Sequence, residues 1–312
     1  MPSRVLAGIL TMPDGVTYEG TWKNGKINGE STLTHANGDV FTGILQDGKR
    51  EGRGKVVYAN GDLYEGQFHK DRRHGNGTFL AADGYRYSGS WQNGKISGRG
   101  EVRYPDGSIY VGAFVEDLPE GVGKITYPDG STYEGNWKVG VIEGAGKATY
   151  PNGLVYEGSF KNAQNHGYGI MTFADSYRYE GNWKDGKRHG AGQARYRDGT
   201  TYVGGFVKGQ RSGEGYIKMK DGFSYTGEWL EGEIHGKGTA TYANGDVYEG
   251  TFRDGKRQGE GTMRYATGEE TSGDWVNGVL TTATPVEGAE PDAEAGAGSE
   301  EAAPDTPETP QD

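Results

Sequence analysis

Aromatic, glycine and polar residues alternate along this chain at a fixed spacing. A Tyr or Phe is followed two positions later by Gly, and two positions after that by Trp or Phe, with Leu45 as the exception. The pattern begins at Tyr18 and returns every 23 residues, so eleven complete units fill residues 18–270 and a partial twelfth begins at Thr271. A constant period of this length indicates a protein built from stacked structural repeats.

Each unit predicts two short strands. In residues 18–22, Tyr, Gly and Trp share one face because successive side chains of a strand point to opposite sides. In residues 29–35 we expect the glycines at positions twelve and fourteen of the unit, the apolar residue at position sixteen and the residue at position eighteen, mostly Tyr, to share that face. Glu, Thr, Lys and Arg occupy the opposite face. This alternation is typical of a half-buried antiparallel sheet.

Asn-Gly and Asp-Gly pairs predict the turns between these strands, because they adopt positive φ at low cost. One turn lies near position eight, as at Asn24-Gly25, and the other at positions twenty and twenty-one. Two units deviate. Unit seven has Ala163 where a glycine turn is expected, and unit five is expected to expose Leu118-Pro119 in its turn. Recognition of these turns by a partner and drift without consequence are both compatible with the sequence.

These elements predict an all-β fold, an elongated and twisted single antiparallel sheet of consecutive hairpins. Such a sheet has no second layer, so we expect each large ring to lie over neighbouring glycines and to contact rings of the next unit. The predicted members of this aromatic face are Tyr18, Trp22, Tyr87, Trp91, Tyr133, Trp137, Tyr179, Trp183, Tyr225 and Trp229.

The predicted organisation has four parts: a partial repeat or cap (1–17), eleven repeats (18–270), a partial repeat (271–280) and a tail (281–312). The tail has nine acidic residues, five prolines and no Lys or Arg, so we expect it to be disordered. It contributes −9 to the net charge of −11, which leaves −2 on residues 1–280. The tail either maintains solubility and discourages strand addition at the open sheet edge, or it is an interaction tail or an electrostatic brake on anionic ligands.

Composition narrows the class of protein further. Glycine accounts for 58 of 312 residues, and aromatics reach 12% although apolar residues total only 32%, which is unlike a disordered chain. The absence of cysteine excludes disulfides, thiolate metal sites and cysteine catalysis. No run of 18 apolar residues and no clear signal peptide is present, so we expect a cytoplasmic protein, either free or peripheral at a membrane.

The consensus Y-E-G-x-W-x-x-G-x-x-x-G-x-G-x-x-x-Y-x-D-G resembles the MORN repeat (membrane occupation and recognition nexus), and residues 133–155 match it nearly throughout. The resemblance extends over about residues 6–280 and implies a twisted antiparallel sheet of hairpins. Family members occur beside lysine methyltransferase or phosphatidylinositol-phosphate kinase domains, or beside the membrane anchors of junctophilins. No such domain is recognisable here, so the resemblance favours a scaffold protein over an enzyme.

No catalytic, cofactor-binding or metal-binding residue is predicted. Four histidines recur at position eleven with the period, too far apart to share one zinc ion: His74, His166, His189 and His235. The glutamates at position two have similar environments, whereas acid–base catalysis needs a pair with divergent pKa values. No glycine-rich phosphate loop precedes a helix. The nearly neutral array also predicts no nucleic-acid binding.

Basic residues around the position-eight turn are the strongest candidates for ligand contacts, because a row of cations along one sheet edge would meet an anionic membrane surface. The row is interrupted by Asp117 and Glu120 in unit five and by Val141 and Glu143 in unit six, so solvated turns are the alternative. The candidate anion or lipid contacts are Lys49, Arg50, Lys70, Arg72, Arg73, Lys187, Arg188, Lys208, Arg211, Lys256 and Arg257.

Two functions follow from these observations. The first is a non-enzymatic scaffold or adaptor that binds protein partners or itself, with homo-oligomers forming through the open ends of the sheet. The second is a peripheral membrane adaptor that binds anionic phospholipids through the basic turns.

Overall fold

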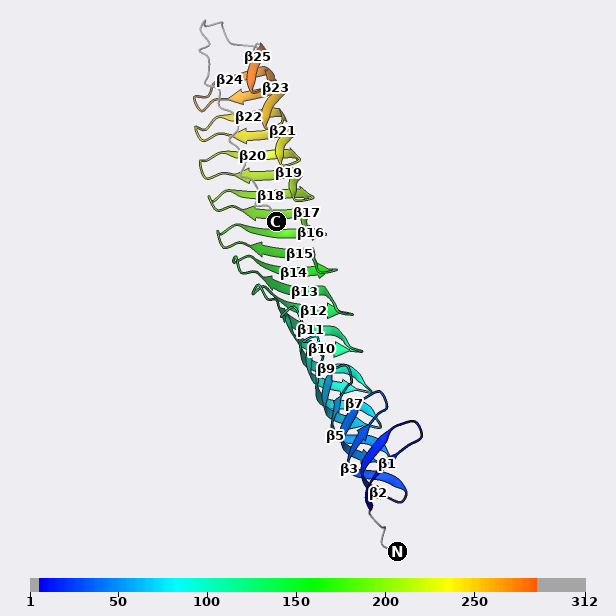
Figure 1. Ribbon diagram of the computed structural model, residues 1–312. Helices are drawn as coiled ribbons and strands as arrows, with labels where there is room; N and C mark the ends of the chain where they lie inside the picture. The colour runs from blue at the N-terminus through cyan, green and yellow to red at the C-terminus, as the bar shows by residue number, and fades with distance from the viewer. Residues whose placement is uncertain (1–5, 285–312) are drawn as a thin grey trace. The chain divides into compact units, whose positions relative to one another are not determined.

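The computed structural model describes residues 6–284, in which the chain forms 25 β-strands and no helix. This confirms the predicted all-β class. Within each of its two compact units, consecutive strands pair antiparallel, so strands that follow one another in sequence lie side by side (Figure 1). The chain divides into two compact units, Met1–Pro151 and Asn152–Asp312, and within each unit the strands form an open sheet of hairpins.

The strands of each unit follow one another in chain order. The first unit contains β1 (Leu6–Thr11), β2 (Thr17–Lys23), β3 (Lys26–Thr34), β4 (Val40–Gln46), β5 (Lys49–Val57), β6 (Leu63–His69), β7 (Arg72–Leu80), β8 (Arg86–Gln92), β9 (Lys95–Arg103), β10 (Ile109–Val115), β11 (Leu118–Thr126), β12 (Thr132–Lys138) and β13 (Val141–Thr149). The second unit contains β14 (Val155–Lys161), β15 (Gln164–Thr172), β16 (Arg178–Lys184), β17 (Lys187–Arg195), β18 (Thr201–Val207), β19 (Gln210–Lys218), β20 (Ser224–Leu230), β21 (Glu233–Thr241), β22 (Val247–Arg253), β23 (Lys256–Arg264), β24 (Glu270–Val276) and β25 (Val279–Thr284).

Two kinds of turn alternate along the chain, as predicted. In the two-residue turn near position eight, both residues have positive φ, for example 52° at Asn24 and 73° at Gly25, which matches the twist of a hairpin. In the other turn, three residues lie between two residues that are joined by a backbone hydrogen bond. In the loop where Tyr58 donates its N–H to the Asp62 carbonyl, Gly61 has φ 93°.

The turn of unit five differs from its prediction. Leu118 and Pro119 begin β11 instead of forming the turn, and Pro119 is buried while Leu118 is exposed. Glu116 and Asp117 form the turn with φ values of 51° and 73°. The prediction was wrong because the ring of proline holds φ near −65°, which a position in this two-residue turn cannot use.

From Tyr64 to Tyr248, each tyrosine at position one lies over two glycines. Tyr64 covers Gly66 of its own strand and Gly77 of β7, which are directly opposite each other in the ladder. A Cβ on Gly77 would lie 2.7 Å from the Tyr64 ring. The Tyr64 hydroxyl donates a 2.9 Å hydrogen bond to the backbone carbonyl of Gln67. The expectation that rings lie over glycines is confirmed.

The rings of successive hairpins form an edge-to-face ladder. Tyr64 contacts Phe68 of its own strand and Trp91 of the next hairpin, with centroids 5.1 and 5.3 Å apart. The Trp91 indole N–H donates to the carbonyl of Gly77 at 3.2 Å. The same contacts recur in the second unit. Each hairpin therefore buries its aromatic face against its neighbours, as in other repeat proteins.

One strand of each hairpin departs from the predicted alternation. In the β2–β3 hairpin, Gly20 pairs with Ser31, and Trp22 pairs with Ile27. Between these two pairs, β3 has two more residues than β2. Gly29, at position twelve, has φ 96° in this bulge and is exposed. Position ten therefore shares the aromatic face with positions fourteen and sixteen. The prediction for position twelve was wrong because the bulge changes which side chains share a face.

The ends of the chain are described only in part. β1 pairs with β2 and supplies the strand expected from the partial repeat before residue 18. β25 includes residues 281–284, which the sequence analysis assigned to the tail. The remaining residues of the predicted tail, 285–312, and residues 1–5 of the predicted cap lie outside the described range.

Candidate functional site

The sheet has two chemically different faces. The aromatic face carries positions one, five, ten, fourteen and sixteen and is closed by its own rings. The opposite side, called the outer face, carries positions two, four, six, thirteen and fifteen, which are mostly exposed. A ligand therefore meets the outer face or the turns along the edges of the sheet.

Five of the predicted anion contacts lie on the aromatic face. Each is an arginine at position ten whose guanidinium packs over rings of its own and the neighbouring hairpins. Arg73 lies 4.3 Å from the ring centroid of Trp91, and Arg211 lies 4.7 Å from that of Trp229, distances typical of cation–π contacts. The five are Arg50, Arg73, Arg188, Arg211 and Arg257.

Arg188 and Arg211 contradict the prediction most clearly, because they are only 6% and 5% exposed. Arg188 donates a hydrogen bond to the Tyr177 hydroxyl and lies 5.7 Å from the Phe206 ring centroid. Burial lowers the pKa of Arg211. Their assignment as anion contacts was wrong, because the bulge near position twelve turns position ten toward the rings, where both side chains are buried.

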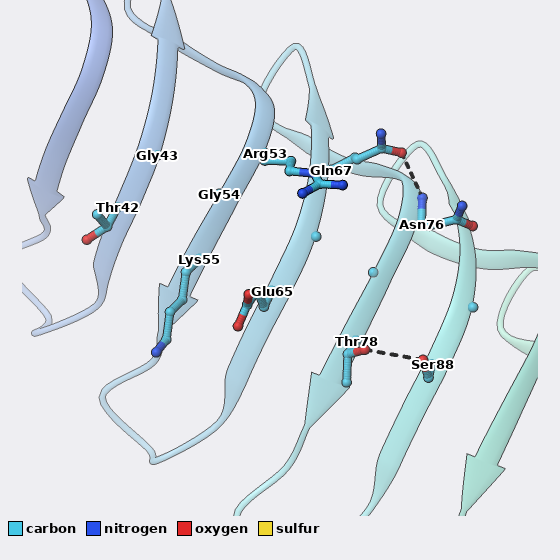
Figure 2. A pocket seen from close by; sticks show the side chains of 13 residues that line it. Thr42, Gly43, Arg53, Gly54, Lys55, Glu65, Gln67, Asn76, Thr78 and Ser88 are labelled. Carbon is cyan, nitrogen blue, oxygen red and sulfur yellow. Dashed lines mark hydrogen bonds between the residues drawn. The ribbon is translucent and has the colours of Figure 1, made fainter.

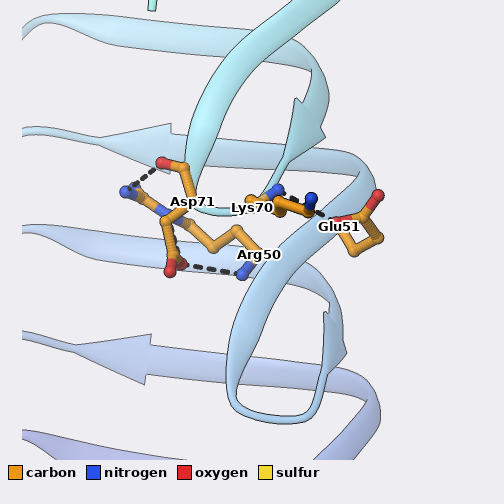
Figure 3. Close-up of polar contacts among 4 residues, drawn as sticks. All are labelled: Arg50, Glu51, Lys70 and Asp71. Atoms are coloured by element: carbon orange, nitrogen blue, oxygen red, sulfur yellow. Dashed lines mark hydrogen bonds and ion pairs between the residues drawn. The ribbon is translucent and has the colours of Figure 1, made fainter. Parts of the chain in front are cut away.

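Acidic side chains attach several of the turns to the preceding hairpin. The Arg50 backbone N–H donates to Asp71 Oδ1 at 2.8 Å, and the Arg50 guanidinium donates to the Asp71 carbonyl at 2.7 Å (Figure 3). Glu51 accepts a 3.0 Å hydrogen bond from the Lys70 backbone N–H. This bond, together with one from the His69 ring, lowers the pKa of the Glu51 carboxyl. Acids near these turns therefore hold backbone in place.

Six of the predicted cations remain exposed at the turn edges. Consecutive hairpins are about 10 Å apart across the sheet, so cations on neighbouring turns form a line and not a cluster. The six residues are Lys49, Lys70, Arg72, Lys187, Lys208 and Lys256.

The outer face of β4–β8 is hollowed into a groove of about 640 Å³ (Figure 2). Its floor is a row of paired glycines, whose backbone lies between two rows of polar side chains. The same glycines support the aromatic rings on the other side of the sheet. The floor consists of Gly43, Gly54, Gly66, Gly77 and Gly89.

Hydrogen bonds order the walls of this groove. The Asn76 backbone N–H donates to Gln67 Oε1 at 2.9 Å, and the Thr78 and Ser88 hydroxyls lie 3.2 Å apart. One wall consists of Thr42, Lys55, Glu65, Thr78 and Ser88, and the other of Arg53, Gln67 and Asn76.

The outer face of β10 is apolar although rings cover its other face. Val111, Ala113 and Val115 point outward, and the two valines are 51% and 53% exposed. The corresponding positions of β12 carry Glu, Asn and Lys. Apolar residues on both faces are typical of a strand that is covered on both sides. Only one side of β10 is covered by the described residues.

The apolar surface continues onto β11 and the next turn. Leu118 is directly opposite Val115, and Val139 is 63% exposed. Val139 has φ 48°, a conformation that is unfavourable for a β-branched residue, so local folding does not favour valine here. We call this surface the outer strip; it comprises Val111, Ala113, Val115, Leu118, Val122, Val139 and Val141.

A smaller apolar surface lies on β18 of the second unit. Val203 and Val207 are exposed on the outer face, and Val203 is directly opposite the exposed Tyr216. Sequence reasoning singled out Leu118 of the outer strip as exposed and missed the rest of both surfaces. The signal was the valine at position two of residues 110–115 and 202–207, where glutamate is the commonest residue. The groove had no comparable signal, because its lining comes from five strands that only the cross-strand register brings together.

The structure buries eight of the ten predicted aromatic-face residues. Tyr18 and Trp22, in the first complete hairpin, are half-buried because no complete ring pair precedes them. Burial raises the pKa of Tyr133 to about 12. The eight buried residues are Tyr87, Trp91, Tyr133, Trp137, Tyr179, Trp183, Tyr225 and Trp229.

The described part of the chain has neither a metal-binding cluster nor a helix that could cross a membrane. Across residues 6–284, His, Asp and Glu side chains never gather in threes around a point where a metal ion would bind. A membrane-spanning helix is likewise absent from these residues.

A single-layer repeat protein, in which glycines support a ladder of rings, is the class that this fold defines. The chain belongs to the MORN repeat family, whose model matches eleven consecutive segments and confirms the resemblance seen in the sequence. The matched residues are 18–40, 41–63, 64–84, 87–109, 110–132, 133–155, 156–176, 179–201, 202–222, 225–247 and 248–270.

The solved structures that the chain matches are only distantly similar to it. The TCP domain of Drosophila melanogaster SAS-4, bound to a proline-rich motif of Ana2, is 15% identical, with 55% of this chain and 86% of that chain covered and a TM-score of 0.32. The Danio rerio CPAP TCP10 domain, bound to a STIL peptide, is 12% identical, with 90% and 100% covered and a TM-score of 0.34. Staphylococcus aureus virginiamycin B lyase is 11% identical, with 87% and 88% covered and a TM-score of 0.15. No curated protein matches the chain.

Proposed function

We propose that this protein is a non-enzymatic MORN-repeat scaffold that binds other proteins through the outer strip. The observation that carries the proposal is the exposed apolar surface of β10, which the sheet does not need for folding. Contiguous exposed apolar surface usually marks a site of protein interaction. Val139 adds to this argument, because it keeps an apolar side chain where its backbone conformation disfavours valine.

The rim of the outer strip indicates the chemistry of the partner. Asp117 accepts a hydrogen bond from the Ile96 backbone N–H and Glu120 from that of Val139, so both carboxylates are held near the turn. A partner with an apolar ridge and a basic residue at one end fits this surface. The charges provide orientation, and burial of the valines provides most of the affinity.

An exchange between two hairpins of the same chain tests the proposal. Val111→Glu, Ala113→Asn and Val115→Lys give β10 the outer residues of β12, which the fold already accommodates. Full-length parent and exchange proteins are incubated with an extract of the source cells, crosslinked and compared by quantitative mass spectrometry. We expect at least one protein to be retained by the parent and lost with the exchange.

The matched control changes polar outer residues only. Thr226→Glu and Glu228→Asn in β20 alter the outer face without removing apolar surface, and this variant should retain the partner. Retention of the same proteins by the β10 exchange would contradict a role for the outer strip, provided that circular dichroism shows equal folding.

Self-association through the sheet ends is a second route to assembly. The described residues pair β1 with β2 only, so the other edge of β1 offers free backbone groups for a strand of a second copy. Light scattering of the full chain over a range of concentrations tests this route. A mass that stays monomeric throughout excludes it without affecting the binding of other proteins by the outer strip.

Binding of anionic phospholipids is the alternative function, favoured by the six exposed turn cations. Each such residue contributes about 1 kcal/mol near an anionic surface, which is enough for weak binding when several act together. Co-sedimentation with vesicles that contain phosphoinositides, compared with phosphatidylcholine vesicles, tests it. Charge reversal of Arg72 and Lys187 should weaken binding, and an absence of binding at low salt would exclude this function.

A further inference from the structure

Three Tyr-Pro pairs occupy consecutive three-residue turns of the first compact unit. They directly follow β9, β11 and β13, at positions eighteen and nineteen, and no other complete repeat has proline at position nineteen. Two of the rings are exposed, Tyr127 by 36% and Tyr150 by 41%. We call this surface the tyrosine–proline row; it comprises Tyr104, Pro105, Tyr127, Pro128, Tyr150 and Pro151.

The turns of the row pack on one another. A Cβ on Gly107 would lie 3.5 Å from Pro128 Cγ, and one on Gly130 would lie 3.9 Å from Pro151 Cγ, so each proline ring rests on the preceding turn. Successive hairpins are two strands apart, which is about 10 Å. The tyrosines therefore recur about every 10 Å along this edge of the sheet.

Elsewhere in the chain, a ring at position twenty-two covers the tyrosine at position eighteen of the next hairpin. Tyr177 contacts Tyr196 with ring centroids 5.3 Å apart, and Phe223 contacts Tyr242 with centroids 5.7 Å apart. Tyr196 and Tyr242 are consequently only 5% and 6% exposed.

Serine stands at position twenty-two before the two exposed tyrosines. Ser108 precedes Tyr127 by 19 residues, the same separation as in the ring pairs above, and Ser131 precedes Tyr150 by the same number. Ser108 Oγ has no hydrogen-bond partner among the described residues, so this serine contributes its small size and not a bond. The place that a ring fills in other hairpins is therefore open beside Tyr127 and Tyr150.

Folding does not account for these serines and prolines. In other hairpins an aspartate at position twenty-two accepts a hydrogen bond from the position-nineteen N–H of the next turn, as Asp39 does from Ala59 at 2.9 Å and Asp62 from Ala82 at 3.0 Å. Proline has no N–H to donate. The row thus lacks a bond that links turns elsewhere and has exposed rings instead.

The spacing of the row matches one backbone conformation of a polypeptide ligand. A polyproline II helix has three residues per turn and rises about 9 Å per turn, so residues three apart face the same side at nearly the spacing of the tyrosines. In a β-strand, residues three apart point to opposite faces. Polyproline II also leaves its carbonyl groups free to accept hydrogen bonds from tyrosine hydroxyls, whereas an α-helix uses its carbonyls internally.

Two carboxylates give the row a negative charge. Asp106 and Asp129 each accept a 2.8 Å hydrogen bond at Oδ1 from the backbone N–H two residues later, and bonds from Ser131 lower the pKa of Asp129. Burial raises the pKa of Tyr127, and the nearby Tyr150, Asp106 and Asp129 raise it further. The carboxylates therefore lie beside the rings, where they complement basic residues of a ligand.

We propose that the tyrosine–proline row binds a proline-rich, basic segment of a partner protein in the polyproline II conformation. One proline lies beside Tyr127 in the place left open by Ser108, and a second, three residues along, lies beside Tyr150 in the place left open by Ser131. Basic residues of the segment pair with the two carboxylates. Aromatic surfaces bind such segments well because the ligand is ordered before it binds. This site shares no residue with the outer strip and goes beyond the function proposed for that surface.

Fluorescence anisotropy with a labelled peptide of four Pro-Ala-Arg repeats tests the proposal on the full-length chain. We expect saturable binding. A peptide of the same composition, rearranged so that no two prolines are three residues apart, should bind at least several-fold more weakly, because it cannot fill both places at once. Equal binding of the two peptides, or no binding of the first, would overturn the inference.

Ser108→Tyr with Ser131→Tyr closes both places from within, as Tyr177 does beside Tyr196. We expect this variant to bind the peptide about tenfold more weakly, since the contacts at the two places supply most of the affinity. Thr226→Tyr is the matched control, because it adds a ring on the exposed outer face of β20 and should leave binding unchanged. Undiminished binding by the double variant would rule out the row as the site.

A second pair of variants covers the case in which the double tyrosine variant does not fold. Asp106→Asn with Asp129→Asn keeps the oxygen that accepts the backbone bond, as Asn60 does at the same repeat position. Loss of two exposed charge pairs should weaken binding roughly threefold. Asp198→Asn with Asp221→Asn makes the same change in the second compact unit and should have no effect. Equal binding by both pairs would contradict the proposed charge contacts.

The two proposals can fail separately. The β10 exchange should leave peptide binding unchanged, and the double tyrosine variant should still retain the proteins captured by the outer strip. Loss of peptide binding with the β10 exchange, while circular dichroism shows a folded chain, would place the peptide on the outer strip and overturn the assignment to the row.

Discussion

At the scale of single residues, glycine is used for two different physical reasons. Gly77, at position fourteen, leaves room for the ring of Tyr64 and has an extended backbone. Gly75, at position twelve, has φ 64° and lies on the outer side of the bulge, beside Gln67. The first glycine is required by a side chain from the neighbouring strand and the second by its own backbone, although the sequence pattern treats the two alike.

Gly77→Ala should destabilise the protein through overpacking. Its new methyl group would lie 2.7 Å from the Tyr64 ring, which is held by rings on both sides. We expect a loss of about 1–3 kcal/mol in the free energy of unfolding, measured by urea denaturation. Gly8→Ala is the matched control, because a Cβ at Gly8 meets no atom within 4 Å. Equal losses in the two variants would contradict this explanation.

At the scale of the hairpin, position ten decides how successive elements pack. Ile27, Ile96, Ile142 and Ile234 occupy the position that carries arginine in five other hairpins. Both residue types lie against rings, and the turn of the next hairpin donates a backbone N–H to the position-ten carbonyl. The guanidinium therefore serves as a flat surface that packs against the rings. This packing does not depend on the charge of the arginine.

Arg188→Ile separates packing from charge. Replacement of a buried charge by an apolar residue of similar size is often neutral or stabilising, so we expect the free energy of unfolding to hold or to rise by about 1 kcal/mol. Vesicle co-sedimentation should not change. Lys187→Glu, next to it in sequence but exposed, is the matched variant and should weaken any vesicle binding. A loss of vesicle binding with Arg188→Ile equal to that with Lys187→Glu would restore the original prediction for Arg188.

At the scale of the whole molecule, stability comes from repetition of one contact set between neighbouring hairpins. A repeat protein of this kind should tolerate the loss of a whole unit more readily than a change of register. The register is visible in the ladder, where Ala194 of β17 is opposite Tyr202 of β18. One full period later, Tyr225 occupies the place equivalent to Tyr202.

Deletion of residues 202–224 removes one period and should leave Ala194 opposite Tyr225. We expect a folded, cooperatively unfolding chain with slightly reduced stability, measured by circular dichroism and urea denaturation. Deletion of residues 202–223 differs by one residue and moves aromatic side chains to the outer face. If the two deletions are equally stable, the register argument is wrong.

The protein should lose stability at a lower alkaline pH than the titration of its lysines and arginines alone would cause. Burial raises the pKa of Tyr64, Tyr110 and Tyr248 from 10.0 to about 12. The neutral rings stabilise the fold fully below pH 10, and this contribution is lost as the pH rises through about 12. Urea midpoints measured from pH 8 upward should therefore decline above pH 10. Tyr64→Phe removes one titrating group and should make the decline shallower; an unchanged decline would contradict the assignment.

The position of the site was only partly predictable from the sequence. The valines of 110–115 and the cations Arg53 and Lys55 are visible as departures from the repeat, but the repeat alone does not indicate which departures gather on one surface. That grouping depends on the cross-strand register, which places Leu118 opposite Val115 and Glu65 opposite Lys55. Side chains from different hairpins become neighbours only in the folded sheet.

The sequence by itself determined the all-β class, the 23-residue unit, the two turns and the rings over glycines, because strand alternation and turn chemistry act between residues close in the chain. Only the tertiary structure decided where position ten lies. The bulge beside position twelve is a property of two paired strands, and it moves Arg188 and Arg211 from an expected membrane edge into the aromatic face. The same pairing aligned the glycines of β4–β8 as the floor of a groove and left the outer side of β10 uncovered.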